Sequence, residues 1–241
     1  MYEHLRCVAL RTVKYDDRHS IVTAWSAERG RVGLLVPSGS SREATRRRAL
    51  MMPLGIFEGE ADIRPGRDIL NIRDVRPLAV LPSISSSPSK SVVAMFLAEV
   101  LGKVLNDAAP DAMLAEFIFR SVITLDGLPP RGVANYPLVF LCRLGGFMGI
   151  EPDAGSWSPG KVFDMKDGLY RSSAPLGGRW LNAEEAAVGA MIQRLTFASG
   201  SRLRLSRGVR RVALDHILEY YTLHLTPLDN LRSLQVLRDL L

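Results

Sequence analysis

The hydrophobic pattern of the chain changes its period once, and this change limits the fold more than any other feature. Up to about Leu81, short β-branched and aromatic runs alternate with polar or glycine-containing turns, as is typical of strands. From Val92 onward, apolar residues recur every three or four positions, which predicts helices with one buried face. The intervening segment 81–90, LPSISSSPSK, shows neither period. We therefore predict an α+β protein with two domains, residues 1–81 and 82–241.

Five strand-like runs in the first domain predict a small β-barrel of the OB-fold type. The runs are CVALRTVKY, SIVTAWSA, RVGLLVPSG, LGIFEGEADI and DILNIRDVRPL. Gly30 can take the positive φ that the turn between the second and third runs requires, so these two strands form an antiparallel pair. The polar and basic stretch SGSSREATRRRAL between the third and fourth runs fits either a loop or a short helix.

The second domain is expected to be mainly α-helical, with an inserted β-hairpin around residues 157–171. The hairpin turns at Lys166-Asp167-Gly168 within KVFDMKDGLYR, where a glycine again suits a tight turn. The apolar period predicts six helices: Val92–Leu105, Ala112–Leu125, Val133–Phe147, Ala183–Phe197, Ser206–Leu223 and Leu228–Leu240.

An excess of basic residues points to polyanionic partners. Lys and Arg number 31 against 25 Asp and Glu, which gives a formal charge of +6, a balance that favours nucleic acid. Arg46, Arg47 and Arg48 follow closely after Arg42 beside the expected barrel, where they would supply salt-sensitive phosphate contacts. The alternative is a solvated charged loop. Candidates on nearby strand ends, which either extend this track or are ordinary surface charges, are Arg11, Lys14, Arg18 and Arg31.

Aromatic side chains on the barrel offer weaker support for single-strand binding. Bases stack on exposed aromatic rings in many single-strand binding proteins, and Tyr15, Trp25 and Phe57 are the candidates in this domain. Trp25 alternates with Ile21 and Thr23 along one side of a strand, so a place in the hydrophobic core is at least as well supported for it.

A second basic group lies at the start of the helix expected from Ser206. Ser206 is a suitable N-cap, and a helix N-terminus surrounded by positive side chains favours an anion such as phosphate or an acidic peptide. The alternative is a charged helix face balanced by Asp215 and Glu219. The group consists of Arg202, Arg204, Arg207, Arg210 and Arg211.

The sequence gives little support to an enzyme or to a bound cofactor. It contains no P-loop, strand-linked GxGxxG, GxSxG or HExxH motif, and His216 and His224 are eight positions apart, too far to bind one metal ion from one helix. Cys7 and Cys142 cannot build a disulfide framework or a four-cysteine metal site. Charges near the N-terminus and the lack of a long apolar stretch argue against a signal peptide or a membrane span. We expect a cytoplasmic protein without catalytic residues, cofactor or metal.

Taken from end to end, the chain resembles the RecO family of bacterial recombination mediators. The matching segments are ALRTVKYDDRHSIVTAWSAERGRVGLLVPSGS, RRRALMMPLGIFEGE, FLAEVLGKVL at Phe96–Leu105, LVFLCRLGGFMGIEP at Leu138–Pro152 and YYTLHLTPLDNLRSLQVLRDL. Each segment is loosely specific alone, but their order and spacing together are fairly specific to this family.

The resemblance implies a bacterial, nucleoid-associated protein that binds single- and double-stranded DNA and anneals complementary strands. It also implies cooperation with RecR in loading RecA onto DNA coated by the single-strand binding protein SSB, and contact with the acidic, Phe-ending C-terminal tail of SSB. Arginines on apolar helices that would suit this tail are Arg120, Arg143, Arg207 and Arg211. The alternative is a non-catalytic adaptor whose OB-like barrel binds a protein partner.

One segment departs from the family pattern. Many relatives carry four cysteines as a zinc module after the glycine-aromatic helix end, whereas residues 151–178 of this chain contain none. We therefore expect no zinc ion, and we expect the hairpin to be held by packing through Trp157, Phe163 and Tyr170.

Overall fold

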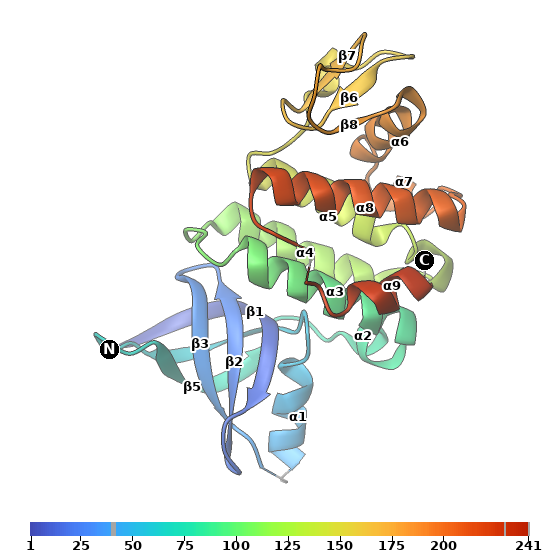
Figure 1. Cartoon of the computed structure of the whole chain (residues 1–241). Helices are drawn as coiled ribbons and strands as arrows, with labels where there is room; N and C mark the ends of the chain where they lie inside the picture. The colour runs from blue at the N-terminus through green and yellow to red at the C-terminus, as the bar shows by residue number, and fades with distance from the viewer. Residues whose placement is uncertain (40–41, 229, 241) are drawn as a thin grey trace. The chain divides into compact units, whose positions relative to one another are not determined.

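The computed structural model describes residues 1–39, 42–228 and 230–240, together with their side chains except those of residues 42, 43 and 240 (Figure 1). Its internal contacts form two compact units, Met1–Gly127 and Leu128–Leu241. The first unit holds the barrel and the three helices that follow it, so the division by contacts falls well after the last barrel strand. The domain boundary at residue 81 stays a prediction.

The first unit begins with a closed five-stranded barrel, which confirms the predicted fold class. The strand order is β1-β2-β3-β5-β4, and β1 closes the barrel by antiparallel pairing with β4. Strands β3 and β5 pair in parallel, as expected of a five-stranded OB-type barrel. The strands are β1 (Tyr2–Lys14), β2 (His19–Ser26), β3 (Gly30–Pro37), β4 (Ile56–Asp62) and β5 (Ile69–Pro77).

Alternation of side chains along the strands fills the barrel. Leu5, Cys7 and Ala9 of β1 point inward and belong to the buried interior cluster. The pairing of β1 with β2 then shifts between Ala9 and Arg11, which marks a β-bulge. Gly30 takes φ +68 at the turn between β2 and β3, as the sequence predicted, and a Cβ there would lie 3.0 Å from the carbonyl oxygen of Ala108.

Four helices complete the first unit: α1 (Arg42–Leu50), α2 (Pro82–Ser86), α3 (Pro88–Val104) and α4 (Ala112–Gly127). Residues 42–50 of the basic stretch between β3 and β4 therefore form a helix, one of the two forms that the sequence allowed. The Ser/Pro-rich segment 81–90 has regular structure, because it forms α2 and the start of α3. The Asp126 carboxylate accepts hydrogen bonds from the amides of Ser83 and Ile84 at 2.8 and 2.7 Å. These two backbone N–H groups in the first turn of α2 have no acceptor within the helix, and Asp126 supplies one.

Buried Lys90 ties these helices together. Its Nζ donates to the Ser83 hydroxyl at 2.7 Å and to the Asp126 carbonyl at 2.6 Å. A buried ammonium needs such acceptors to offset the loss of water. The junction of α2, α3 and α4 is thus fixed by hydrogen bonds between residues 36 to 43 positions apart.

The second unit is mainly helical and carries a small sheet, as predicted. Its elements are η1 (Pro130–Gly132), α5 (Tyr136–Phe147), η2 (Ala154–Ser156), β6 (Val162–Asp164), β7 (Leu169–Arg171), β8 (Trp180–Leu181), α6 (Ala183–Gln193), α7 (Phe197–Gly200), α8 (Arg207–His224) and α9 (Leu234–Leu240). The expected helix 183–197 is divided because Thr196 caps a new helix through the Ser199 amide. The last helix begins at Leu234 rather than at residue 228.

The predicted hairpin is part of a three-stranded sheet of order β7-β6-β8. Its turn uses Gly168 at φ +68. Phe163 and Tyr170 pack with their ring centroids 4.8 Å apart, and Tyr220 of α8 lies 5.7 Å from Phe163. Trp157 packs on this cluster and lies under the Arg194 guanidinium, 4.6 Å from ring centroid to Cζ. Aromatic packing connects the sheet to the helices.

Within the described ranges, no helix has both the length and the apolar character that a membrane crossing requires.

Candidate nucleic-acid interface

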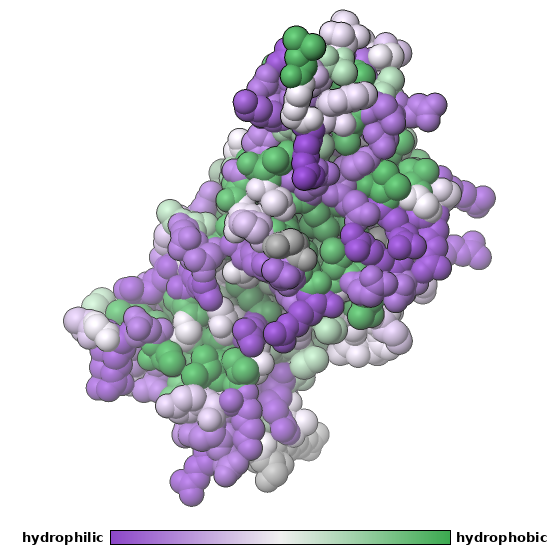
Figure 2. All heavy atoms as spheres, viewed as in Figure 1, coloured by the Kyte–Doolittle hydropathy of each residue, from purple (hydrophilic) through white to green (hydrophobic). Residues whose placement is uncertain are grey.

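The outward face of β2, β3 and β5 is the surface of the barrel with the features of a strand-binding site. Strand pairing places Thr23, Gly33 and Ile69 in one row across these strands, and Ile21, Leu35 and Asn71 in the next. Figure 2 shows hydrophobic atoms gathered on the barrel and bordered by hydrophilic ones. A surface of this kind can accept apolar base faces while charged side chains at its edge hold the phosphates.

The loop between β1 and β2 borders this face and has a defined conformation. The Asp16 carboxylate accepts from the amides of Arg18 and His19 at 2.7 and 2.6 Å. The hydrogen bond from the His19 ring, followed by that from the Arg18 amide, lowers the pKa of Asp16. Tyr15 projects from this loop with 64% of its surface exposed. The loop therefore presents an open aromatic ring beside Arg18.

Three of the predicted barrel residues stand exposed and without an ion pair to any described side chain: Arg11, Arg18 and Arg31. Arg11 lies opposite Thr23 and Arg31 opposite Trp25 in the strand register. Lys14 is also exposed, but it pairs with Asp17 at 2.7 Å. The structure thus brings Arg11, Arg18 and Arg31 onto or beside the outward face of β1, β2 and β3.

The arginine run is not one patch, because it lies on α1. Successive side chains of a helix diverge by about 100°, so Arg46, Arg47 and Arg48 point in different directions. Arg47 is half-buried and donates to the Pro37 carbonyl at 3.5 Å, and Arg48 donates to the Thr45 hydroxyl at 3.1 Å. Arg46 and Arg48 are exposed. The side chain of Arg42 lies outside the described part of the structure.

Two of the three proposed aromatic platforms are buried. Trp25 and Phe57 are each 0% exposed, so neither ring is open to a base and the stacking prediction is wrong for both. Phe57 belongs to the barrel interior, whereas Trp25 lies outside that cluster, opposite Val8 in the register. Tyr15 is the one candidate of the three that remains.

Sequence reasoning missed basic residues of the loop between β4 and β5. Arg64 and Arg67 are exposed there. Arg64 pairs with Asp62 at 2.7 Å, whereas Arg67 has no ion pair to a described side chain. The loop ends next to β3, since a Cβ on Gly33 would lie 3.1 Å from the Asp68 carbonyl. The signal was RPGRD at 64–68, a Pro-Gly turn between arginines in a loop that OB-type barrels use for ligands.

The second basic group is divided between free and structural arginines. Ser206 caps α8 as predicted, accepting from the Val209 amide at 3.3 Å. Arg207 donates to the carbonyls of Arg238 and Asp239 at the end of α9. Arg210 donates to the Leu205 carbonyl at 2.5 Å, and its burial, followed by the nearby Arg207 charge, lowers its pKa. The exposed members with no ion pair to a described residue are Arg202, Arg204 and Arg211.

The acidic residues on α8 do not balance this group. Asp215 pairs with Arg238 at 2.5 Å, and Glu219 pairs with Arg179. The remaining candidates for a partner tail are also engaged: Arg120 pairs with Glu116, and Arg143 donates to the Leu195 carbonyl at 2.7 Å.

Metal-ligating side chains are not gathered into a metal site in the part of the chain that the structure describes. Among the described residues, His, Cys, Asp and Glu form no group of three suited to a metal ion. Burial raises the pKa of the Cys7 and Cys142 thiols, so both are held protonated rather than as nucleophilic thiolates.

The fold and its exposed arginines define a class of protein with an N-terminal OB-type barrel and a C-terminal helical domain. The family model described as "Recombination protein O C terminal" matches residues 85–235. The DNA repair protein RecO of Phocaeicola vulgatus is 33% identical over 233 residues, 97% of this chain and 96% of that protein. The RecO of Porphyromonas gingivalis ATCC 33277 is 33% identical over 240 residues, 98% of this chain and 97% of that protein. The chain belongs to the RecO family of DNA repair proteins.

Proposed function

We propose that the chain is a non-catalytic mediator of DNA repair and recombination. It binds single- and double-stranded DNA, anneals complementary strands, and helps RecR load RecA onto DNA coated by SSB. Membership of the RecO family supports this proposal. Annealing needs no reacting side chain, because it requires only that two phosphate backbones be held together while their charges are screened.

The observation that carries the DNA-binding proposal is the set of arginines around the outward barrel face. Arg11, Arg18, Arg31 and Arg67 are exposed, and none has an ion pair to a described side chain. Unpaired guanidinium groups can bind phosphate without first breaking an internal contact. With Tyr15 open beside them, the face combines charge with a stacking surface.

Arg46, Arg48, Arg202 and Arg204 are proposed as further phosphate contacts, because they too are exposed and without an ion pair to a described side chain. Arg47 and Lys14 are weaker candidates, since each already has an internal partner.

The second proposed partner is the acidic tail of SSB. Among the four arginines proposed for it, Arg211 is exposed and has no partner among the described residues, whereas Arg120, Arg143 and Arg207 are engaged. Arg211 is therefore the first candidate for the carboxylates of the tail.

A protein adaptor is the second candidate function. The observation in its favour is the apolar residues in two neighbouring rows of the barrel face, where Ile69 is exposed and Ile21 and Leu35 are half-buried. Such residues also fit a protein interface. In this case the arginines would contribute little to activity.

Fluorescence anisotropy of a labelled single strand, titrated with the full chain at several salt concentrations, tests the proposal. The four arginines of the barrel face contribute about −2.8 to the slope of log affinity against log salt, to which any further phosphate contacts add, and Arg11→Glu/Arg31→Glu should make the slope shallower by about 1.4. Arg120→Glu/Lys166→Glu makes the same change of net charge off the barrel and should leave the slope unchanged. Absence of binding at low salt would overturn the proposal and favour the adaptor.

A further inference from the structure

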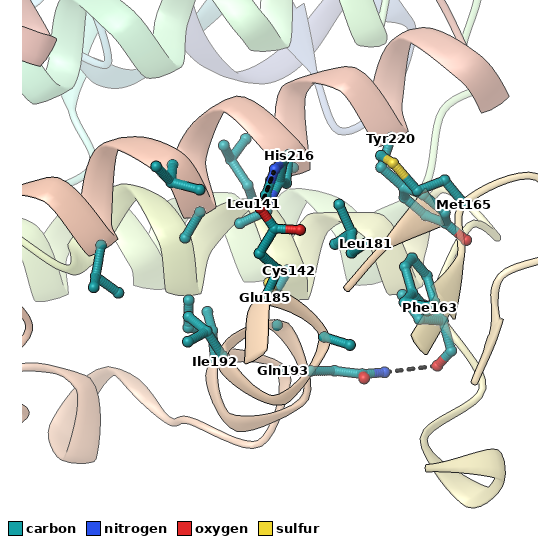
Figure 3. Close-up of a pocket in the computed structure, with 18 of the residues that line it drawn as sticks. Leu141, Cys142, Phe163, Met165, Leu181, Glu185, Ile192, Gln193, His216 and Tyr220 are labelled. Atoms are coloured by element: carbon teal, nitrogen blue, oxygen red, sulfur yellow. Dashed lines mark hydrogen bonds and ion pairs between the residues drawn. The ribbon is translucent and has the colours of Figure 1, made fainter. Parts of the chain in front are cut away.

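The second unit contains an apolar groove that the DNA-binding proposal does not use. Its volume is about 510 Å³, within the range of ligand-binding pockets. Helix α5 forms its floor, α6 and α8 form its sides, and the small sheet closes one end (Figure 3). Apolar residues dominate the lining, among them Leu141, Phe163, Leu181, Ile192, Val212 and Ile217.

The polar groups of this groove are mainly acidic or accepting. Glu184 is exposed and has no ion pair to a described side chain. Glu185 accepts from the Asn182 amide at 3.0 Å and lies 3.8 Å from the His216 ring, and Figure 3 shows Glu185 and His216 facing each other across the groove. No Lys or Arg of the described chain lines it. The groove therefore favours a cationic group and disfavours an anionic one.

A buried acceptor in the lining also lacks a donor. Gln193 is 8% exposed, and its Nε2 donates to the Pro152 carbonyl at 2.7 Å. Its Oε1 is buried without a hydrogen-bond partner among the described residues. A buried amide oxygen costs free energy until a donor reaches it, so a ligand with an N–H group would stabilise this site.

The apolar lining of the groove is partly open to solvent along α8. Val209 and Val212, one helical turn apart, are 36% and 45% exposed. A small molecule held at the end closed by the sheet would leave these two lining side chains in water, whereas a peptide segment lying along α8 would cover them. This exposed apolar side of the groove favours a macromolecular occupant.

We propose that this groove binds a segment of a protein partner that carries apolar side chains next to a lysine or arginine. The apolar side chains enter between α6 and α8, the cation pairs with Glu184, and an N–H group donates to Gln193. This function goes beyond the proposed one, because DNA and the SSB tail are both anionic and would be repelled by Glu184 and Glu185.

Selection of a random 12-residue peptide library against the full chain tests this proposal, followed by anisotropy of the selected peptides. Gly189 lines the groove, and a Cβ there meets nothing within 4 Å. Gly189→Leu thus fills the groove while leaving the fold intact. Gly102→Leu is the matched control, since Gly102 also lies inside a helix with open space around it.

The selected peptides should combine apolar residues with Lys or Arg. They should lose about tenfold or more in affinity to Gly189→Leu, about fivefold to Glu184→Lys, and nothing to Gly102→Leu. An acidic peptide ending in Phe should bind the parent and Gly189→Leu equally. Selection of acidic peptides would overturn the proposal, and so would selection of peptides whose affinity is the same for the parent chain and for Gly189→Leu. Failure of DNA binding in the salt titration would bear only on the proposed function.

Discussion

Gly168 gives the sharpest test of the inference that aromatic packing holds the small sheet. It takes φ +68, and a Cβ added there would lie 2.7 Å from the Tyr220 hydroxyl oxygen. Gly168→Ala therefore introduces two penalties. A left-handed backbone costs a non-glycine residue about 1–2 kcal/mol, and overpacking against Tyr220 adds about 1–3 kcal/mol. We expect the sheet to be destabilised by about 2–5 kcal/mol in total.

Removing the obstructing hydroxyl separates the two penalties. In a Tyr220→Phe background, Gly168→Ala should cost only the backbone part, about 1–2 kcal/mol. The coupling between the two sites is then about 1–3 kcal/mol. Gly149 supplies a control, since it takes φ +71 with nothing within 4 Å of its added Cβ; Gly149→Ala should show the backbone penalty alone.

Hydrogen exchange is the suitable assay because it reports local opening. The Tyr170 amide donates to the Ser156 hydroxyl at 2.9 Å and monitors the sheet, while the Ile150 amide, bonded to the Gly145 carbonyl at 2.9 Å, monitors the Gly149 control. If Gly168→Ala costs the same in both backgrounds, Tyr220 does not press on the hairpin turn and the packing account of the sheet is refuted.

Buried polar groups also determine three measurable properties of the chain. Lys90→Ala should destabilise the first unit by about 1–3 kcal/mol in urea unfolding, because the acceptors at Ser83 and Asp126 lose their donor; an unchanged midpoint would contradict this role. Although burial alone raises the pKa of Asp164, hydrogen bonds from Arg171 and from the Asp167 and Lys166 amides lower it overall. The contribution of ionised Asp164 to folding stability is therefore complete above pH about 4, the pKa of Asp in the unfolded chain, and it is lost as the pH falls through the lower folded pKa. Asp164→Asn should flatten the acid limb of a curve of unfolding free energy against pH, and an unaltered limb would refute this. Burial raises the pKa of both thiols, so iodoacetamide should modify Cys7 and Cys142 only as fast as the chain unfolds, and rapid native-state labelling would be the contrary result.

The barrel could be predicted because its determinants are local. Alternating apolar residues such as Val32, Leu34 and Val36 fill the interior at every second position, and Gly30 sits where the turn demands a positive φ. Trp25 could not be assigned in this way. It lies on the side opposite the barrel interior and is nevertheless fully buried, and strand alternation does not say whether an outward face is covered.

The Ser/Pro-rich segment shows why other parts were missed. The Asp126 carboxylate accepts from the first amides of helix α2 across 42 and 43 residues, and Lys90 connects α3 to the Asp126 carbonyl across 36 residues. No local pattern encodes a cap at such a distance. In the same way, the run Arg46–Arg48 was visible in the sequence, but whether its side chains gather or diverge depended on its being a helix.

Photocrosslinking of the full chain to a single strand containing bromodeoxyuridine tests the central claim most directly. If DNA lies on the outward face of β2, β3 and β5, the crosslinked peptides should include Tyr15, the exposed aromatic residue beside Arg18. Arg11→Glu/Arg31→Glu should reduce that crosslink, and Arg120→Glu/Lys166→Glu should preserve it. Crosslinks confined to residues 128–240, with none in the barrel, would contradict the account.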